Sequence, residues 1–219
     1  MDPTWLSNAY AVADREGGSA VFVDSGAPLA PLLQAVESWG VQPAAILRTH
    51  GHHDHIAHED ELRRRFTIGV VTLSANFGAL EVEALPSEGH ADDGLAFFVN
   101  GEAVFTGDTL FKDAVGGGLD VPAIRRSVMN VLMELPPETR VLPGHTEETT
   151  IGREWEENPF VRFWRGEAPG VDERCRVGGR AATLLVWSPD YDRRGKALVR
   201  FEDGDEAIVG GSRVQRTRP

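Results

Sequence analysis

The sequence has a single cysteine, no long apolar run and no recognisable export signal. Cys175 is the only cysteine among 219 residues, which excludes an internal disulfide framework and is typical of a reducing compartment. No run of about 18 apolar residues is present to span a membrane. The first residues, Met1–Trp5, lack the basic and apolar regions of a signal peptide. We therefore expect a soluble, cytoplasmic protein without a membrane partner.

Basic residues are also scarce. The chain contains 22 Lys and Arg residues against 34 Asp and Glu residues, so its net charge is −12. Binding to nucleic acid depends on clustered Lys and Arg side chains, which displace counterions from phosphate. The composition therefore argues against a nucleic-acid partner, and we expect a small-molecule substrate.

The charge is unevenly distributed along the chain. Residues 1–170 contain 12 basic and 26 acidic side chains, whereas residues 171–219 contain 10 and 8. The change falls within residues 165–170, where glycine and proline interrupt both helices and strands. We predict a main domain over residues 1–168 and a small β-rich C-terminal module over residues 169–219.

Strand-like and helix-like segments alternate in the main domain. Residues 8–13 and 19–24 predict a β-hairpin. Apolar residues at helical spacing predict a helix from Leu29 that ends at Gly40. Further strands are predicted at residues 44–47, 79–85, 102–105 and 140–142, and further helices at 59–66 and 124–135. This alternation is typical of a layered α/β domain.

The C-terminal module has a different pattern. Residues 182–187, 196–202 and 206–209 are strand-like, and Asp203-Gly204 is a turn signal between the last two. These segments predict a small antiparallel β-sheet.

Histidines are concentrated in one place, since five of the seven lie between His50 and His58. The segment from His50 to His55 offers imidazoles at positions 50, 52 and 55 and a carboxylate at Asp54, directly after a predicted strand. Imidazole nitrogens with carboxylate oxygens suit zinc, and also iron or manganese. One loop cannot complete two metal shells. Further ligands are expected from other strand ends, where His90, Asp108 and His145 lie.

Three ordered motifs resemble those of the metallo-β-lactamase-fold hydrolases, within the glyoxalase II-like (hydroxyacylglutathione hydrolase-like) branch. The motifs are Thr-His-Gly-His-His-Asp-His at 49–55, Phe-Thr-Gly-Asp-Thr-Leu-Phe at 105–111 and Leu-Pro-Gly-His at 142–145, the last followed by related segments at 149–154 and 158–160. The resemblance covers about residues 5–165. It implies a four-layer αββα sandwich with a two-metal site at one edge.

The resemblance also implies a ligand set for two divalent ions, with zinc expected first. It assigns His50, His52 and His90 to the first metal, assigns Asp54, His55 and His145 to the second, and makes Asp108 the bridge between them. Two ions about 3.5 to 4 Å apart can share a water and present it as a hydroxide nucleophile. Asp54 is then also the catalytic candidate, because it could orient the hydroxide or pass its proton to the leaving group.

Other candidates receive plainer interpretations. His90 lies in Ser-Glu-Gly-His-Ala, where the family usually has Pro-Gly-His-Thr, and its loss would weaken or empty the first site. His53 and His58 are expected outside the ligand set. Cys175 is expected to be a packed or idle thiol. Three acids are expected to lie in turns or loops, namely Asp24, Asp92 and Asp93.

The substrate is predicted more coarsely. Relatives in this branch usually hold glutathione with a basic residue after the bridging aspartate, but residues 116–118 here are glycines, and Lys112 is the one cation of that loop. The helical C-terminal domain that completes the glutathione site is also absent, because the tail is β-like. We expect hydrolysis of a thioester, lactone or similar small ester, and do not favour glutathione thioesters in particular.

Two other functions remain open. One is a mononuclear-iron persulfide dioxygenase, which uses chiefly the first site of the same fold. The other is a non-catalytic protein with a relic metal site, whose tail binds a partner through a basic surface beside Trp187 and Tyr191. That surface would comprise Arg193, Arg194, Lys196, Arg213, Arg216 and Arg218. We favour a structural role for the tail, in which the β module caps the main domain or joins two copies as a homodimer. Nucleic-acid cleavage is the function we favour least.

Overall fold

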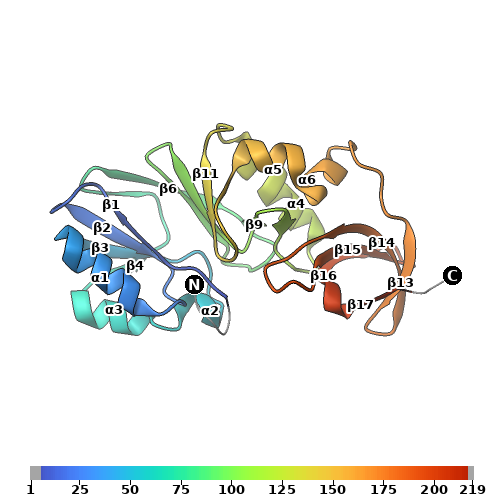
Figure 1. Cartoon of the computed structure of the whole chain (residues 1–219), viewed down its shortest axis with the longest axis horizontal. Coiled ribbons are helices and arrows are strands. Elements are labelled where there is room, and N and C mark those ends of the chain that lie inside the picture. The colour runs from blue at the N-terminus through green and yellow to red at the C-terminus, as the bar shows by residue number, and fades with distance from the viewer. Residues whose placement is uncertain (1–5, 217–219) are drawn as a thin grey trace.

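The computed structural model describes residues 6–216. Two mixed β-sheets form the centre of the N-terminal part of the chain (Figure 1). The first sheet has the order β1-β2-β3-β4 and the second the order β12-β11-β8-β7-β6-β5. The first comprises β1 (Tyr10–Ala13), β2 (Ser19–Val23), β3 (Gln42–Leu47) and β4 (Gly69–Val71). The second comprises β5 (Ala75–Phe77), β6 (Leu80–Pro86), β7 (Leu95–Val99), β8 (Ala103–Gly107), β11 (Arg140–Pro143) and β12 (Thr149–Thr150).

Helices cover the outer face of each sheet. The first sheet is covered by α1 (Leu29–Trp39) and α3 (Glu59–Phe66), and the short helix α2 (His53–Ile56) precedes α3. The second is covered by α4 (Val121–Asn130), a 3-10 turn η1 (Leu132–Glu134), α5 (Ile151–Glu157) and α6 (Pro159–Trp164). A short hairpin of β9 (Leu110–Phe111) and β10 (Ala114–Val115) follows β8.

The alternation of side chains along the strands produces the layers. In β2, Val21 and Val23 face the core between the two sheets, whereas Ala20 and Phe22 face the core under α1 and α3. In β8, Phe105 joins the inner core, whereas Val104 joins the outer core under α4 and α5. Strands buried on both faces in this way require a helix layer on each side. The predicted αββα sandwich is confirmed.

The helix boundaries follow local signals in most places. α1 ends before Gly40, whose φ of 63° is the left-handed conformation that favours glycine, and α3 covers residues 59–66 as predicted. The helix predicted over residues 124–135 is shorter, because α4 ends at Asn130 and the chain continues as η1. Val128 and Leu132 still belong to one core cluster, so the predicted apolar spacing holds although α4 ends between them.

The C-terminal module is a five-stranded antiparallel sheet with the order β16-β15-β14-β13-β17. Its strands are β13 (Glu173–Val177), β14 (Arg180–Ser188), β15 (Lys196–Phe201), β16 (Glu206–Gly210) and β17 (Val214–Arg216), with a 3-10 turn η2 (Gly211–Arg213) before the last. The sequence prediction found β14, β15 and β16. It missed β13 and β17 because charged side chains alternate in the first and only three residues form the second.

The module shares a core with the N-terminal part. Leu184 and Val199 face a small core of the module's own. A β-bulge in β14 and the alternation in β15 turn Leu185, Val186 and Leu198 towards the cluster that contains α4 and α6. The predicted division at residues 168 and 169 stays a prediction. Within residues 6–216, no helix is both long and apolar enough to cross a membrane.

The shared core predicts that both parts unfold together. Leu198 is fully buried, so Leu198→Ala should lower the free energy of unfolding by roughly 2–5 kcal/mol. Urea unfolding, followed by tryptophan fluorescence and by circular dichroism, should show one transition at a lower midpoint. Thr183→Ala, on the partly exposed face of β14, is the control and should change stability by less than about 1 kcal/mol. Two separate transitions, with only one displaced by Leu198→Ala, would contradict a common core.

Candidate metal centre

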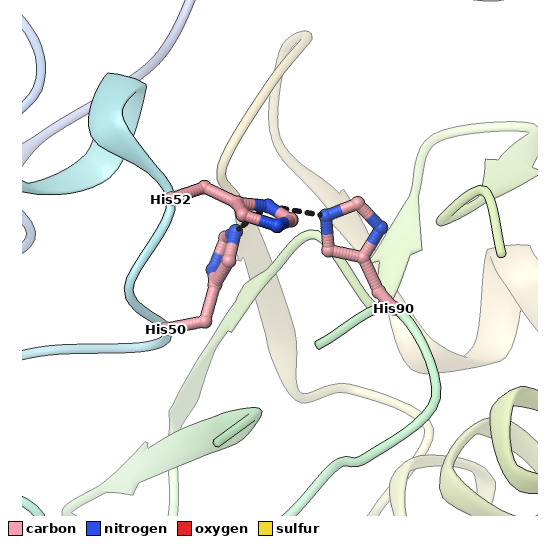
Figure 2. A group of neighbouring side chains, drawn as sticks. All are labelled: His50, His52 and His90. Carbon is pink, nitrogen blue, oxygen red and sulfur yellow. Dashed lines mark hydrogen bonds between the residues drawn. The ribbon is translucent and has the colours of Figure 1, made fainter. Parts of the chain in front are cut away.

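All seven ligand candidates lie together at one end of the two sheets. His50 and His52 follow β3, and His55 lies in α2 directly behind them. His90 lies between β6 and β7, Asp108 follows β8, and His145 follows β11. The parallel pairing of β8 with β11 brings the last two side by side. Figure 2 shows His50 and His52 extending from one loop towards His90, which comes from another.

The ligand atoms form three overlapping groups. In each group, one atom from every residue lies within 4.8 Å of the others. The groups are His50, His52 and His90; His50, His55 and Asp108; and Asp54, His55 and His145. The first and third are the two sets that the sequence motifs imply. Which of these residues bind a metal stays a prediction.

Asp108 lies between the two sets. Its carboxylate oxygens are 3.3 Å from His55 Nε2, 3.4 Å from His90 Nε2 and 3.4 Å from His145 Nε2. The aspartate is 8 % exposed. It therefore has the position expected of a ligand shared by two ions.

Unpaired polar atoms at the centre fit a bound cation. Asp108 Oδ1 and His55 Nε2 are buried. Although they lie 3.3 Å apart, neither forms a hydrogen bond with the other or with another described residue. His52 Nδ1 lies 3.0 Å from both His50 Nε2 and His90 Nε2, although a ring nitrogen holds at most one proton (Figure 2). Buried polar atoms without partners are costly. A divalent cation would satisfy several at once, and this nitrogen and oxygen donor set suits zinc, iron or manganese.

Asp24 lies in the loop after β2, as predicted, but its carboxylate is also a part of the site that was not predicted from the sequence. Its carboxylate is buried and accepts hydrogen bonds from Thr49 N at 2.8 Å and Thr49 Oγ1 at 2.7 Å. It also lies 2.7 Å from His55 Nδ1. The carboxylate of Asp24 can accept a hydrogen bond from a protonated Nδ1. This contact fixes the orientation of the His55 ring, so that Nε2 faces the cluster. The position of Asp24 at the end of β2, beside the end of β3, is the sequence signal that could have identified it.

Backbone carbonyls orient two further histidines. His90 Nδ1 lies 2.8 Å from Gly117 O, and His145 Nδ1 lies 2.9 Å from Leu6 O. Both contacts direct Nε2 towards Asp108. The glycines at 116–118 allow this arrangement, because a Cβ at Gly116 would lie 1.9 Å from Asp108 O. A side chain at Gly116 or Gly118 would collide with the backbone of Asp108 or Gly89.

Protons balance the carboxylates in the metal-free cluster. Burial alone would lower the pKa of His55, but Asp108 and Asp24 outweigh it and raise that pKa to about 10. His145 is raised to about 9 in the same way, by Asp108 and Asp54 acting against burial. Burial, aided by the neighbouring His55, lowers the pKa of His50 to about 3. Neutral His50 is therefore ready to coordinate, whereas His55 and His145 must first lose a proton.

Residues assigned no metal role lie outside the three groups. His53 is exposed, and His58 precedes α3 with its backbone N–H bonded to Ser25 O. Cys175 is buried in the module's own core, which confirms the packed thiol. Asp92 and Asp93 are exposed turn residues, as predicted.

The proposed basic surface of the tail is partly wrong. Tyr191 stacks on His145, with ring centroids 4.1 Å apart and planes 8° apart. Burial, followed by the charges of Asp108 and other nearby acids, raises the pKa of Tyr191. Lys196 is buried in an ion pair with Asp190 at 3.0 Å. Both residues therefore belong to the site rather than to a partner-binding face, and Arg218 lies outside the described residues.

Removing the charge of Asp24 should weaken the site. In Asp24→Asn, an amide replaces the carboxylate beside His55 Nδ1, so His55 loses its oriented proton. We expect the affinity for the cation held by His55 to fall by about 10- to 100-fold, measured by competition with a chromophoric chelator. Asp93→Asn removes an exposed acid and should leave the affinity unchanged. Equal affinity in both variants would contradict the role of Asp24.

Metal binding should depend strongly on pH. At pH 7 the raised pKa values leave His55 and His145 protonated in the metal-free protein, so a cation must displace these protons. Apparent Zn²⁺ affinity should therefore fall as pH is lowered from 9 to 6, by up to about 100-fold per unit if both protons leave. Calorimetry in buffers of different ionisation enthalpy measures the release directly. Zero net release between pH 6 and 8 would contradict the charge state described here.

Comparison with known proteins gives the family. The family model described as "Metallo-beta-lactamase superfamily" matches residues 2–88. An uncharacterised protein of Aquifex aeolicus is 31 % identical, over 70 % of this chain and 91 % of the relative. A Bacillus subtilis protein named probable metallo-hydrolase YqgX is 26 % identical, over 71 % of this chain and 92 % of that protein.

Solved structures agree with the sequence relatives. ETHE1 from Myxococcus xanthus is 28 % identical with a TM-score of 0.66, over 74 % of this chain and 82 % of that one. TTHA1623, solved in a di-iron-bound form, is 30 % identical with a TM-score of 0.59, over 73 % and 97 %. Together with the αββα layers and the gathered histidines, these similarities show that the chain belongs to the metallo-β-lactamase superfamily, whose members are typically metal-dependent hydrolases.

Proposed function

We propose that this protein is a dinuclear metal-dependent hydrolase of thioesters, lactones or similar small esters, of the glyoxalase II-like kind. The observation that carries the proposal is the position of Asp108, which lies within 3.4 Å of histidines from both ligand sets. A buried carboxylate shared by two sets of imidazoles is the arrangement that a two-metal site needs.

The residues present define where each cation would be held. His50, His52 and His90 would hold the first, Asp54, His55 and His145 the second, and Asp108 both. The cations would supply Lewis acidity, which lowers the pKa of water and polarises a carbonyl group. Zinc is the cation we propose. Iron is the alternative, and the di-iron form of the related TTHA1623 supports it.

Asp54 is the carboxylate best placed to move a proton. Its side chain is 28 % exposed, against 10 % for Asp108, so it can reach a substrate while Asp108 stays enclosed. Asp54 Oδ2 lies 3.5 Å from His145 Nε2. Contact with that histidine lowers the pKa of Asp54, although partial burial acts in the opposite direction. The carboxylate is therefore ionised at neutral pH and can accept a proton on Oδ2 before passing it to the leaving group.

A nucleophilic side chain is not needed for this chemistry. Cys175 is enclosed in the module's core, and the Thr49 hydroxyl donates a hydrogen bond to Asp24.

The glutathione preference of the resembling branch receives less support. Lys112, the cation of the loop after Asp108, is already paired with Glu147.

The second candidate is a mononuclear-iron persulfide dioxygenase, which the similarity to ETHE1 supports. Such an enzyme would use the set of His50, His52 and His90 with Asp108, and would leave the second set without a metal. Metal content separates the two candidates. About two equivalents of metal favour the hydrolase, whereas one equivalent of iron with oxygen consumption on glutathione persulfide favours the dioxygenase. A metal-loaded protein with neither activity would favour the relic site.

Replacing the shared carboxylate should abolish hydrolysis. Asp108→Ala is expected to reduce turnover to the uncatalysed background and to lower bound metal from two equivalents to one or fewer, because both cations lose a ligand. Metal is quantified on protein purified without added metal, beside a panel of S-lactoylglutathione, other thioesters and lactones. Asp92→Ala, which removes an exposed acid, is the control and should retain both metal and rate. Retention of the rate in Asp108→Ala would overturn the proposal, as would less than half an equivalent of any transition metal in the unaltered protein.

A further inference from the structure

A cavity of about 790 Å³ is formed by both parts of the chain, and Tyr191, which stacks on His145, is one of its lining residues. Lys112 and Thr146 line it from the N-terminal part, and Thr146 directly follows His145. Residues 189–193, which connect β14 to β15, line it from the C-terminal module. A molecule in this cavity therefore contacts the module as well as the main sheets.

Tyr191 connects the cavity to the cluster. Its ring lies flat on His145 and edge-on to Phe111, at centroid distances of 4.1 and 6.0 Å. Its hydroxyl is recorded in no hydrogen bond with any of residues 6–216. An aromatic ring with a free hydroxyl can pack against an acyl chain and donate to one of its oxygens.

A buried ion pair holds this loop in place. Asp190 pairs with Lys196 at 3.0 Å, and their side chains are only 3 % and 10 % exposed. Asp190 Oδ1 also accepts a hydrogen bond from Tyr191 N at 2.9 Å. Such a pair costs more to bury than an apolar substitute, so its effect lies in fixing geometry. Here the fixed geometry is that of Tyr191 against His145.

The charges around the cavity leave one cation available. Four acids line it. Three are paired within the protein, Glu147 with Lys112, Asp113 with Arg153 and Asp190 with Lys196, whereas Asp192 lies 3.9 Å from the exposed Arg194. Arg193 is the remaining charged lining residue, and the structure records no ion pair for it within residues 6–216. A guanidinium without a partner is suited to a single carboxylate.

We propose that the loop of residues 189–193 completes the substrate site, with Tyr191 contacting the acyl group and Arg193 binding one carboxylate of the substrate. The inference rests on the proposed hydrolase function. It narrows the substrate to thioesters or esters whose acyl part carries one negative charge, and it makes the C-terminal module a determinant of specificity.

Binding of two unreactive analogues tests the inference. S-carboxypropyl-N-acetylcysteamine and S-butyl-N-acetylcysteamine differ in a terminal carboxylate and contain no thioester to cleave. Calorimetry on the full-length, zinc-loaded protein should show about tenfold tighter binding of the carboxylate analogue. Arg193→Gln should remove this preference, whereas Arg176→Gln, on the exposed face of the module, should keep it.

Tyr191 is tested with the same analogues. Tyr191→Ala should weaken the binding of both analogues severalfold. Tyr191→Phe should recover most of that loss, because the ring still covers His145 and the analogues have no acyl oxygen to accept a bond from the hydroxyl. Bound zinc should stay unchanged in both variants. Equal binding of the two analogues by the unaltered protein, a preference that survives Arg193→Gln, or unchanged binding by Tyr191→Ala would each overturn the inference.

Hydrolysis of the matching thioesters separates this inference from the proposed function. S-succinyl- and S-butyryl-N-acetylcysteamine are the substrates, and the succinyl compound should have the higher kcat/KM. An Arg193-dependent binding preference without hydrolysis would overturn the hydrolase and leave the carboxylate site standing. Hydrolysis without that preference would overturn the carboxylate site and leave the hydrolase standing.

Discussion

The buried carboxylate of Asp108 is the group on which the rest of the site depends. A carboxylate that loses its water must be compensated by nearby positive charge, or it destabilises the fold. Protonated His55 and His145, at 3.3 and 3.4 Å, supply that charge, and they come from α2 and from the loop after β11. The backbone must therefore bring these segments unusually close. Glycines make this possible: a Cβ at Gly144 would lie 2.5 Å from Asp108 Oδ1, and one at Gly26 would lie 1.4 Å from Asp54 O.

The C-terminal module is joined to this constraint through the backbone. Ile208 in β16 exchanges two hydrogen bonds with Gly118, and the adjacent Gly117 carbonyl contacts His90 Nδ1. Ser188 also donates to Asp113 O, on the loop that follows Asp108. The module thus supports a ligand candidate of the first set through Gly117 and covers one of the second through Tyr191. Its position is coupled to the cluster as well as to the shared core.

How far the sequence predicts this molecule depends on whether a feature is local. Residues close together in the chain predict the helix that ends at Gly40 and six strands of the two sheets, namely β1, β2, β3, β6, β8 and β11. The other four strands, β4, β5, β7 and β12, were not predicted. His50, His52, His55 and His145 could be grouped because they belong to recognisable motifs that come after strands, and His90 because it follows a predicted strand. Asp24 and Tyr191 carry no motif, and their roles depend on contacts 31 and 46 positions away in the chain, with His55 and His145. Only the packing of the folded chain brings such residues to the site.

The glycine loop and the module together explain where a cation for the substrate can lie. At Gly116 and Gly118 a side chain has no room, because Asp108 O and Gly89 O approach within 1.9 and 2.7 Å of where a Cβ would be. Lys112, at the start of that loop, is neutralised by Glu147. In the substrate site proposed above, the cation therefore comes from another element. Arg193 lines the same cavity as Lys112, so the proposal assigns recognition of the substrate carboxylate to the module.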